Sequence, residues 1–190
     1  LTEIITDFNH HYPQVLVEID ISNRETSLNK RDADIALRMF RPTQPDLVAR
    51  RLPDIELCFV ASNKYLQGRP DLNSLEDISQ HDLIGFDKDV QFRKAIAALG
   101  WPITENNLIN RTDFLPLQIE LVRNGAGISA THKYLLNRFR ELQTVLPNVP
   151  IPSLEFWLVC HADVQHNRKI RVMMDFLSME LKNRLVPPLS

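Results

Sequence analysis

Two short apolar runs that end at polar residues constrain the fold of this chain more than any other feature of its sequence. The charged stretch Asn29–Asp34 leads into Ile35–Arg38, a pattern typical of a helix end followed by a buried strand. A second apolar run, Leu57–Ala61, is typical of another buried strand and stops at Ser62, which is predicted to cap the Lys64–Gln67 turn. Strands of this kind, placed between helical segments, indicate an α/β fold.

The N-terminal third is predicted to contain two helices and several strands. Apolar residues recur at helical spacing from Leu1 to Tyr12, and Pro13 stops the pattern. Val15–Ile21 is predicted to be a strand, and the capping-box pattern from Ser22 to Glu25 predicts a short helix to about Lys30. Further strands are expected at Asp34–Met39, at Leu47–Leu52 and at Ile55–Ala61, the last two separated by Pro53-Asp54.

The rest of the chain continues to alternate between helices and strands. A helix capped by Asp113 or Thr112, with Pro116 in its first turn, is expected to run to Asn124. The other expected helices are one opening at Ser74–Asp77, Gln91–Leu99, Lys133–Phe139 and a final helix from Ile170 to Leu185. The other expected strands are Leu83–Phe86, Asn107–Arg111, Ile128–Ala130 and Leu154–His161. This order predicts an α/β fold with a partly parallel sheet.

Composition and charge exclude several classes of protein. The 190 residues are 44% apolar and 24% charged, which is ordinary for a globular protein and argues against disorder. The apolar runs are too short for a membrane span, and no signal-peptide pattern is present. The formal net charge of −2 comes from scattered charges, so Arg50-Arg51 and Arg168–Arg171 are interpreted as solvated faces and not as a DNA-binding patch.

No pattern in the sequence points to catalysis or to a metal site. It contains no nucleophile elbow, no phosphate-binding loop and no dinucleotide fingerprint, and its six histidines show no ligand spacing. We therefore predict a protein that is not an enzyme and that needs no cofactor or metal. Cys58 and Cys160 lie in apolar strand-like runs and are predicted to be buried and reduced, although a redox pair between neighbouring strands stays open.

The order and spacing of four segments resemble the effector-binding domain of LysR-type transcriptional regulators, and the resemblance covers nearly the whole chain. The segments are Asp34-Ile-Ala36, Ala61-Ser62 with Tyr65-Leu66, Gly125–Ser129, and Trp157-Leu-Val159. The resemblance implies two Rossmann-like lobes joined by two crossover strands, similar to type 2 periplasmic binding proteins. Lobe I is expected at residues 1–60 and 157–190, and lobe II at residues 61–156. Leu1 is not a start methionine, so the chain is expected to be a fragment that lacks the family's N-terminal winged helix-turn-helix.

The same resemblance implies that a small-molecule effector binds in the cleft between the lobes. The predicted effector contacts are Arg38, Met39, Phe40, Ser62, Thr112, Asp113, Phe114, Leu115 and Phe156. Phe156 and Trp157 are neighbours on a strand, so one is expected to face the cleft and the other the core. Simpler roles also fit: Arg38 pairs with a nearby acid, and Ser62 only caps a turn. Asp113 at a helix start favours a neutral or cationic effector, or one bound away from it.

The leading hypothesis is the regulatory domain of a cytoplasmic bacterial transcription factor. By the resemblance, the domain is expected to form a homodimer through the helices Arg24–Lys30 and Gln91–Leu99, within a tetramer of the full-length protein. DNA is expected to contact only the missing N-terminal domain, and no membrane partner is expected. The alternatives are a solute-binding protein of a transport system, which would need a secretory leader, and an enzyme of the same architecture.

Overall fold

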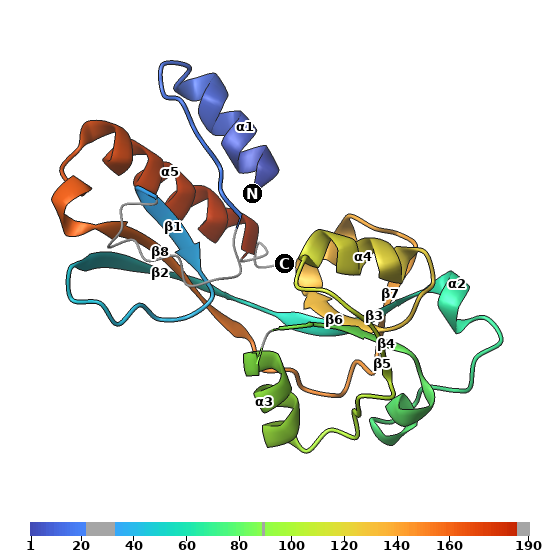
Figure 1. The fold of residues 1–190 in the computed structure, drawn as a ribbon. Helices are drawn as coiled ribbons and strands as arrows, with labels where there is room; N and C mark the ends of the chain where they lie inside the picture. The colour runs from blue at the N-terminus through green and yellow to red at the C-terminus, as the bar shows by residue number, and fades with distance from the viewer. Residues whose placement is uncertain (22–32, 89, 186–190) are drawn as a thin grey trace. The chain divides into compact units, whose positions relative to one another are not determined.

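The computed structural model describes residues 1–21, 33–88 and 90–185, which divide into two compact units. Unit 1 comprises residues 1–55 and 153–190, and unit 2 comprises residues 56–152. Each unit contains both helices and strands, so the predicted α/β class is confirmed (Figure 1).

Unit 1 is built on an antiparallel sheet in which the last strand of the chain lies in the centre. The sheet order is β1 (Ile35–Arg38), β8 (Leu154–His161) and β2 (Leu47–Ile55). The long helix α5 (Arg168–Leu185) lies against β2, and the short 3₁₀ helix η4 (Ala162–Val164) connects β8 to it. Leu158 of β8 is fully buried, as expected for the middle strand of a sheet covered by a helix.

The first helix, α1 (Thr2–His11), packs against α5 and so joins the two ends of the chain (Figure 1). Ile4 and Phe8 face the contact and are buried. The ring of Phe8 lies 4.9 Å from that of Tyr12 and 5.3 Å from that of Phe176 on α5. The apolar stripe read from the sequence is therefore the face that packs.

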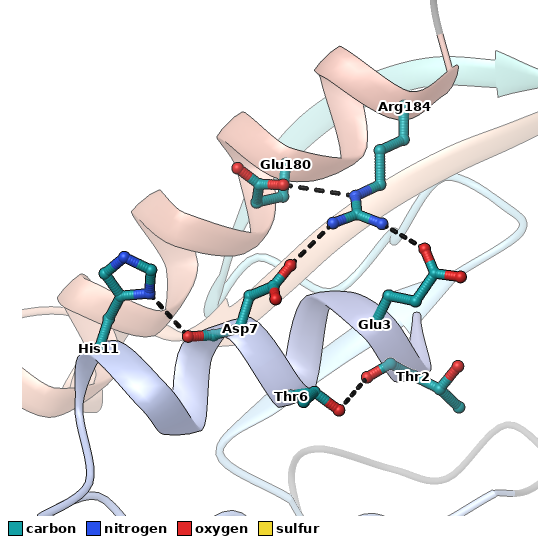
Figure 2. Close-up of polar contacts among 7 residues, drawn as sticks. All are labelled: Thr2, Glu3, Thr6, Asp7, His11, Glu180 and Arg184. Atoms are coloured by element: carbon teal, nitrogen blue, oxygen red, sulfur yellow. Dashed lines mark hydrogen bonds and ion pairs between the residues drawn. The ribbon is translucent and has the colours of Figure 1, made fainter.

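A single arginine adds a polar connection between the same two helices, as Figure 2 shows. The Arg184 guanidinium contacts Glu3 Oε2 at 2.5 Å and Asp7 Oδ2 at 2.9 Å on α1, and Glu180 Oε2 at 3.3 Å on its own helix. One guanidinium therefore forms ion pairs with three carboxylates, two near the start of the chain and one near its end.

We expect Arg184→Met to destabilise unit 1 by about 1 kcal/mol, the scale of a partly exposed ion-pair network. Loss of the cation leaves Glu3, Asp7 and Glu180 to repel one another across the α1–α5 contact. Urea unfolding in a Trp101→Phe background, where Trp157 is the sole tryptophan, measures the change, which should shrink at high salt. Arg171→Met is the control, because Arg171 lies exposed on the same helix. An equal loss in both variants contradicts the assigned role of Arg184.

Unit 2 contains an antiparallel sheet and a parallel strand pair that are connected through one backbone bridge. The antiparallel sheet has the order β6 (Ser129–His132), β3 (Leu57–Ser62) and β7 (Leu142–Val145). β4 (Leu83–Gly85) pairs in parallel with β5 (Leu108–Arg111), and Leu83 also bridges to Ile128 beside β6. The helices are α2 (Asn63–Leu66), α3 (Val90–Leu99) and α4 (Leu115–Arg123), with 3₁₀ helices η2 (Glu76–Gln80) and η3 (Lys133–Asn137).

Acidification should destabilise unit 2 through His132, the last residue of β6. Burial lowers the pKa of this imidazole below its usual 6.5. As the pH falls through 6.5, the unfolded chain binds the proton first, so the free energy of unfolding declines until the folded pKa is reached. The slope contributed by one such site is at most about 1.4 kcal/mol per pH unit.

The measurement is urea unfolding at a series of pH values, comparing the parent chain with His132→Asn. The variant should have a flatter profile between neutral pH and about pH 5, since it has lost the titrating group. Asp77 and Glu141 act in a separate window: hydrogen bonds lower the pKa of both carboxyl groups, so their contribution is lost only at more acidic pH. Identical slopes above pH 5 in both proteins contradict the prediction.

Most of the predicted elements are confirmed, with small shifts at their ends. The helix after Leu1, the strand Leu154–His161 and the final helix lie where the sequence placed them. The predicted helices at Ser74–Asp77 and Lys133–Phe139 are the 3₁₀ helices η2 and η3. Among the described residues, parallel pairing is limited to β4 with β5 and to the bridge between Leu83 and Ile128. The predicted helix Arg24–Lys30 lies outside the described residues.

Two predictions for strands were wrong, and one strand was missed. Val15–Ile21 is not a strand: it is paired with no strand of the described chain, and Leu16 is 86% exposed. Pro53-Asp54 does not end β2; the pairing register shifts between Leu52 and Ile55, and an edge strand tolerates a proline at such an irregularity. β7 was missed, since its four residues carry no strong pattern and are followed by Leu146 with φ +51°.

The boundaries between the units fall at 55/56 and 152/153, whereas we expected them at 60/61 and 156/157. The physical reason is strand pairing. β3 pairs along its length with β6 and β7 of unit 2, and β8 pairs with β1 and β2 of unit 1. Each of these strands therefore belongs to a single unit from its first residue.

No helix in the described ranges combines the length and the apolar character needed to cross a bilayer.

Candidate functional site

The carboxyl ends of the two parallel strands of unit 2 bring one group of predicted site residues together. β4 ends at Gly85 and β5 at Arg111, and the backbone N–H of Thr112 donates to Gly85 O at 3.0 Å. The chain then turns into α4, so Thr112–Leu115 lie where loops of an α/β sheet commonly hold ligands. We call residues 112–115 the unit 2 loop.

A buried glutamine, which the sequence analysis missed, fixes this loop. The side chain of Gln118 on α4 donates from Nε2 to Thr112 O at 2.5 Å and to Gly85 O at 3.3 Å. It is almost fully buried. A polar residue one turn into an otherwise apolar helix face is the signal that indicates such a role, because a buried amide needs partners.

The prediction that Thr112 or Asp113 caps α4 was wrong. The N-cap residue is Phe114, which makes no side-chain capping bond. Thr112 Oγ1 instead accepts from the backbone N–H of Phe114 at 3.2 Å. The Asp113 carboxylate accepts from the N–H groups of Asp87 at 3.1 Å and Lys88 at 3.1 Å, in the loop after β4. Asp113 therefore ties two loops together, and its charge is partly offset by these backbone dipoles.

The apolar members of the unit 2 loop lie at the surface. Phe114 is 56% exposed, Leu115 is also well exposed, and so is Leu117, two residues further along α4. Large apolar side chains that gather at a strand-end loop are a feature of ligand sites.

Ser62 caps the turn after β3, as predicted. Its Oγ accepts from the backbone N–H of Tyr65 at 3.3 Å, and the side chain is buried. The side chain of Tyr65 extends this hydrogen-bond network. Its hydroxyl accepts from the N–H of Asp82 at 2.8 Å and lies 3.3 Å from His81 Nδ1. These bonds give Ser62 and Tyr65 a structural role beside the core of unit 2.

The second group of predicted residues lies at the end of β1 in unit 1. Arg38 is buried and donates from Nη1 to Gln44 Oε1 at 3.1 Å, and its guanidinium lies 5.6 Å from the ring centre of Phe40. Met39 and Phe40 are 39% and 40% exposed. The arginine is held in place while the two residues after it face solvent.

Of the two aromatic neighbours on β8, Phe156 is buried and Trp157 is half-buried. The indole N–H of Trp157 donates to Glu155 Oε2 at 3.0 Å. The guanidinium groups of Arg41 and Arg51 lie 5.9 Å and 5.6 Å from its ring centre, within reach of cation–π attraction. Sequence reasoning missed both arginines, since their proximity to Trp157 depends on pairing between distant strands.

Two hollows within unit 2 lie apart from the predicted residues. A small apolar cavity is lined by residues that include Phe59, Ile96 and Trp101. An open polar groove runs between residues 66–72 and 143–147. Neither is lined by the unit 2 loop.

The two cysteines belong to different sheets. Cys58 lies in β3 of unit 2 and Cys160 in β8 of unit 1; both are free and buried, and burial raises the pKa of each thiol. A raised pKa makes a thiol less reactive at neutral pH. Within the described ranges, no three histidine, cysteine or acidic side chains gather as metal ligands.

Comparison with known proteins gives matches along almost the whole chain. A sequence profile described as the LysR substrate binding domain matches residues 1–182. The HTH-type transcriptional regulator CrgA of Neisseria meningitidis serogroup C (strain 8013) is 27% identical over 191 residues, covering 97% of this chain and 64% of CrgA. The HTH-type transcriptional activator TtdR of Escherichia coli (strain K12) is 25% identical over 198 residues, covering 97% and 61%. The chain thus spans about three fifths of the length of these relatives.

A solved structure shows the same fold. The regulatory domain of CrgA from Neisseria meningitidis, a LysR-type transcriptional regulator, superposes with a TM-score of 0.79 at 27% identity, covering 95% of this chain and 91% of that domain. The expected type 2 periplasmic-binding-protein-like fold is confirmed by this match.

Proposed function

The chain belongs to the LysR substrate-binding domain family, and from this membership we propose that it is the ligand-sensing regulatory domain of a LysR-type transcriptional regulator. The profile match over residues 1–182 is the observation that carries the proposal. The relatives are transcriptional regulators, which favours this function over the transport alternative.

The proposal assigns effector contacts in each unit. In unit 1 they are Arg38, Met39 and Phe40, with Trp157 in place of the buried Phe156. In unit 2 they are the loop residues Thr112–Leu115; Ser62 supports the fold as a cap. The exposed apolar groups and the fixed polar groups in both sets suit a small molecule that needs apolar contact and a few oriented hydrogen bonds.

An effector acts by favouring one conformation of the domain over another. It shifts that equilibrium only to the extent that it binds the two conformations with different affinity. We propose that the whole protein passes the shift to DNA through a region outside these 190 residues, because their net charge of −2 gives no basic footprint. We further propose a cytoplasmic homodimer without catalytic activity, assembled into a tetramer in the full-length protein.

Thermal unfolding in the presence of small metabolites tests the sensing function. A true effector raises the midpoint in proportion to the logarithm of its concentration, because it binds the folded state. Phe114→Ala should weaken the affinity for the effector about tenfold, so that about ten times more effector is needed for the same midpoint shift. The substitution removes an exposed aromatic contact and does not disturb the core. Tyr134→Ala is the matched control: Tyr134 is an exposed aromatic residue of unit 2 on η3. A flat response to organic acids, amino acids, aromatic compounds and amines contradicts the proposed function.

A further inference from the structure

Arginine and aromatic side chains gather on one face of the unit 1 sheet. Arg38 of β1 and Arg51 of β2 both lie directly opposite Trp157 of β8, so all three side chains leave the sheet on the same side. Arg41, just beyond β1, stacks on the same indole ring. We call Arg41, Arg51 and Trp157 the indole stack.

The arginines of this face differ in how their charges are balanced. Arg51 contacts Asp54 Oδ1 at 2.8 Å and Glu155 Oε1 at 3.9 Å, so its charge is matched by nearby carboxylates. Arg38 is buried and bonded to Gln44. Arg41 is exposed, and among the described residues its guanidinium contacts the Trp157 ring and no carboxylate. Arg41 is therefore the arginine of this face placed to receive an anion.

Stacking prepares Arg41 for this role. A guanidinium lying on an aromatic face keeps its edge N–H donors open, and those donors match a carboxylate in two-pronged geometry. The indole N–H is already bonded to Glu155, so the ring supplies orientation and not a competing donor. The exposed Met39 and Phe40 provide apolar surface next to it in the chain.

Resting on the proposed function, we infer that the effector is an aromatic carboxylate whose anionic group binds Arg41. The Asp113 carboxylate in unit 2 accepts from two backbone N–H groups, which partly offset its charge. The aromatic part of the effector packs on the apolar side chains that follow Arg38.

Trp157 itself can report the binding. The chain has two tryptophans, so Trp101→Phe leaves Trp157 as the sole indole fluorophore. This variant is titrated with benzoate, phenylacetate and cinnamate, and with benzamide and benzylamine as neutral and cationic probes. At least one carboxylate should change the emission saturably, while benzamide and benzylamine should not.

Variants at Arg41 then test the residue. Arg41→Met should weaken binding of the responding carboxylate at least about tenfold, the scale of a lost charge-assisted hydrogen bond, and Arg41→Lys should retain part of it. Arg171→Met, which removes one exposed positive charge from α5, should leave the affinity unchanged. Equal affinity in the parent chain and Arg41→Met, or an equal response to benzamide, overturns the inference.

Failure of the inference and failure of the proposed function give different results. If neutral or cationic metabolites raise the thermal midpoint and Phe114→Ala weakens the effect, the domain is a sensor and the aromatic-carboxylate assignment is wrong. If no compound of any class raises the midpoint, the proposed function fails together with it.

Discussion

Gly127→Ala is expected to destabilise unit 2 by about 3 kcal/mol, at the upper end of the cost of forcing extra atoms into a packed interior. A Cβ at this position would lie 2.6 Å from the carbonyl oxygen of Asp82 and 3.0 Å from its carbonyl carbon. The oxygen is not free to move aside, because it accepts from the N–H of Ile128 at 2.9 Å. The Asp82 N–H is held in turn by the Tyr65 hydroxyl at 2.8 Å.

The clash therefore weakens the backbone hydrogen bonds that join Ile128 to Asp82 and to β4. Urea unfolding in a Trp157→Phe background, where Trp101 reports unit 2, measures the loss. Gly68→Ala is the matched control: Gly68 has φ +75° and a Cβ there would meet nothing within 4 Å. That change should cost only about 1 kcal/mol, the price of a left-handed conformation for alanine. Equal losses for the two variants contradict the assigned close approach.

Phe8→Ala is expected to destabilise unit 1 by about 4 kcal/mol, within the range for truncating a buried aromatic residue. Phe8 is 0% exposed and stands between Tyr12 and Phe176, so its removal leaves a cavity where α1 meets α5.

Urea unfolding in the Trp101→Phe background reports this change through Trp157 of unit 1. Phe8→Leu is the control, because it preserves most of the apolar volume and should cost less than about 1.5 kcal/mol. A loss of under about 1 kcal/mol for Phe8→Ala, the range of a surface substitution, would show that α1 contributes little to unit 1.

Local patterns were sufficient where an element depends mainly on its own residues. The helical stripe from Leu1 to Tyr12 predicts the face that buries Ile4 and Phe8. The apolar run Leu154–His161 predicts β8 with its exact bounds, because a central strand is buried along most of its length. The Ser62 cap was also predictable, since its partner lies three residues away.

Local patterns failed where the outcome depends on a distant partner. Val15–Ile21 has the composition of a strand, but a strand forms only beside another strand. Aspartate is a residue type that commonly caps helices, but the Asp113 carboxylate accepts from backbone N–H groups 25 and 26 positions earlier in the chain. The position of Arg51 opposite Trp157 follows from a sheet register that no short segment contains, and Arg41 reaches the same ring from beyond the end of β1.

The central place of β8 in its sheet has a consequence for synthesis on the ribosome. β1 and β2 are translated early, yet the strand that pairs with both is made about a hundred residues later. Residues 56–152 form one continuous segment and are free to fold while the ribosome is still at work. The backbone N–H and C=O groups of nascent β1 and β2 therefore stay unpaired until β8 has been translated. We expect this early segment to depend most on chaperones before translation ends.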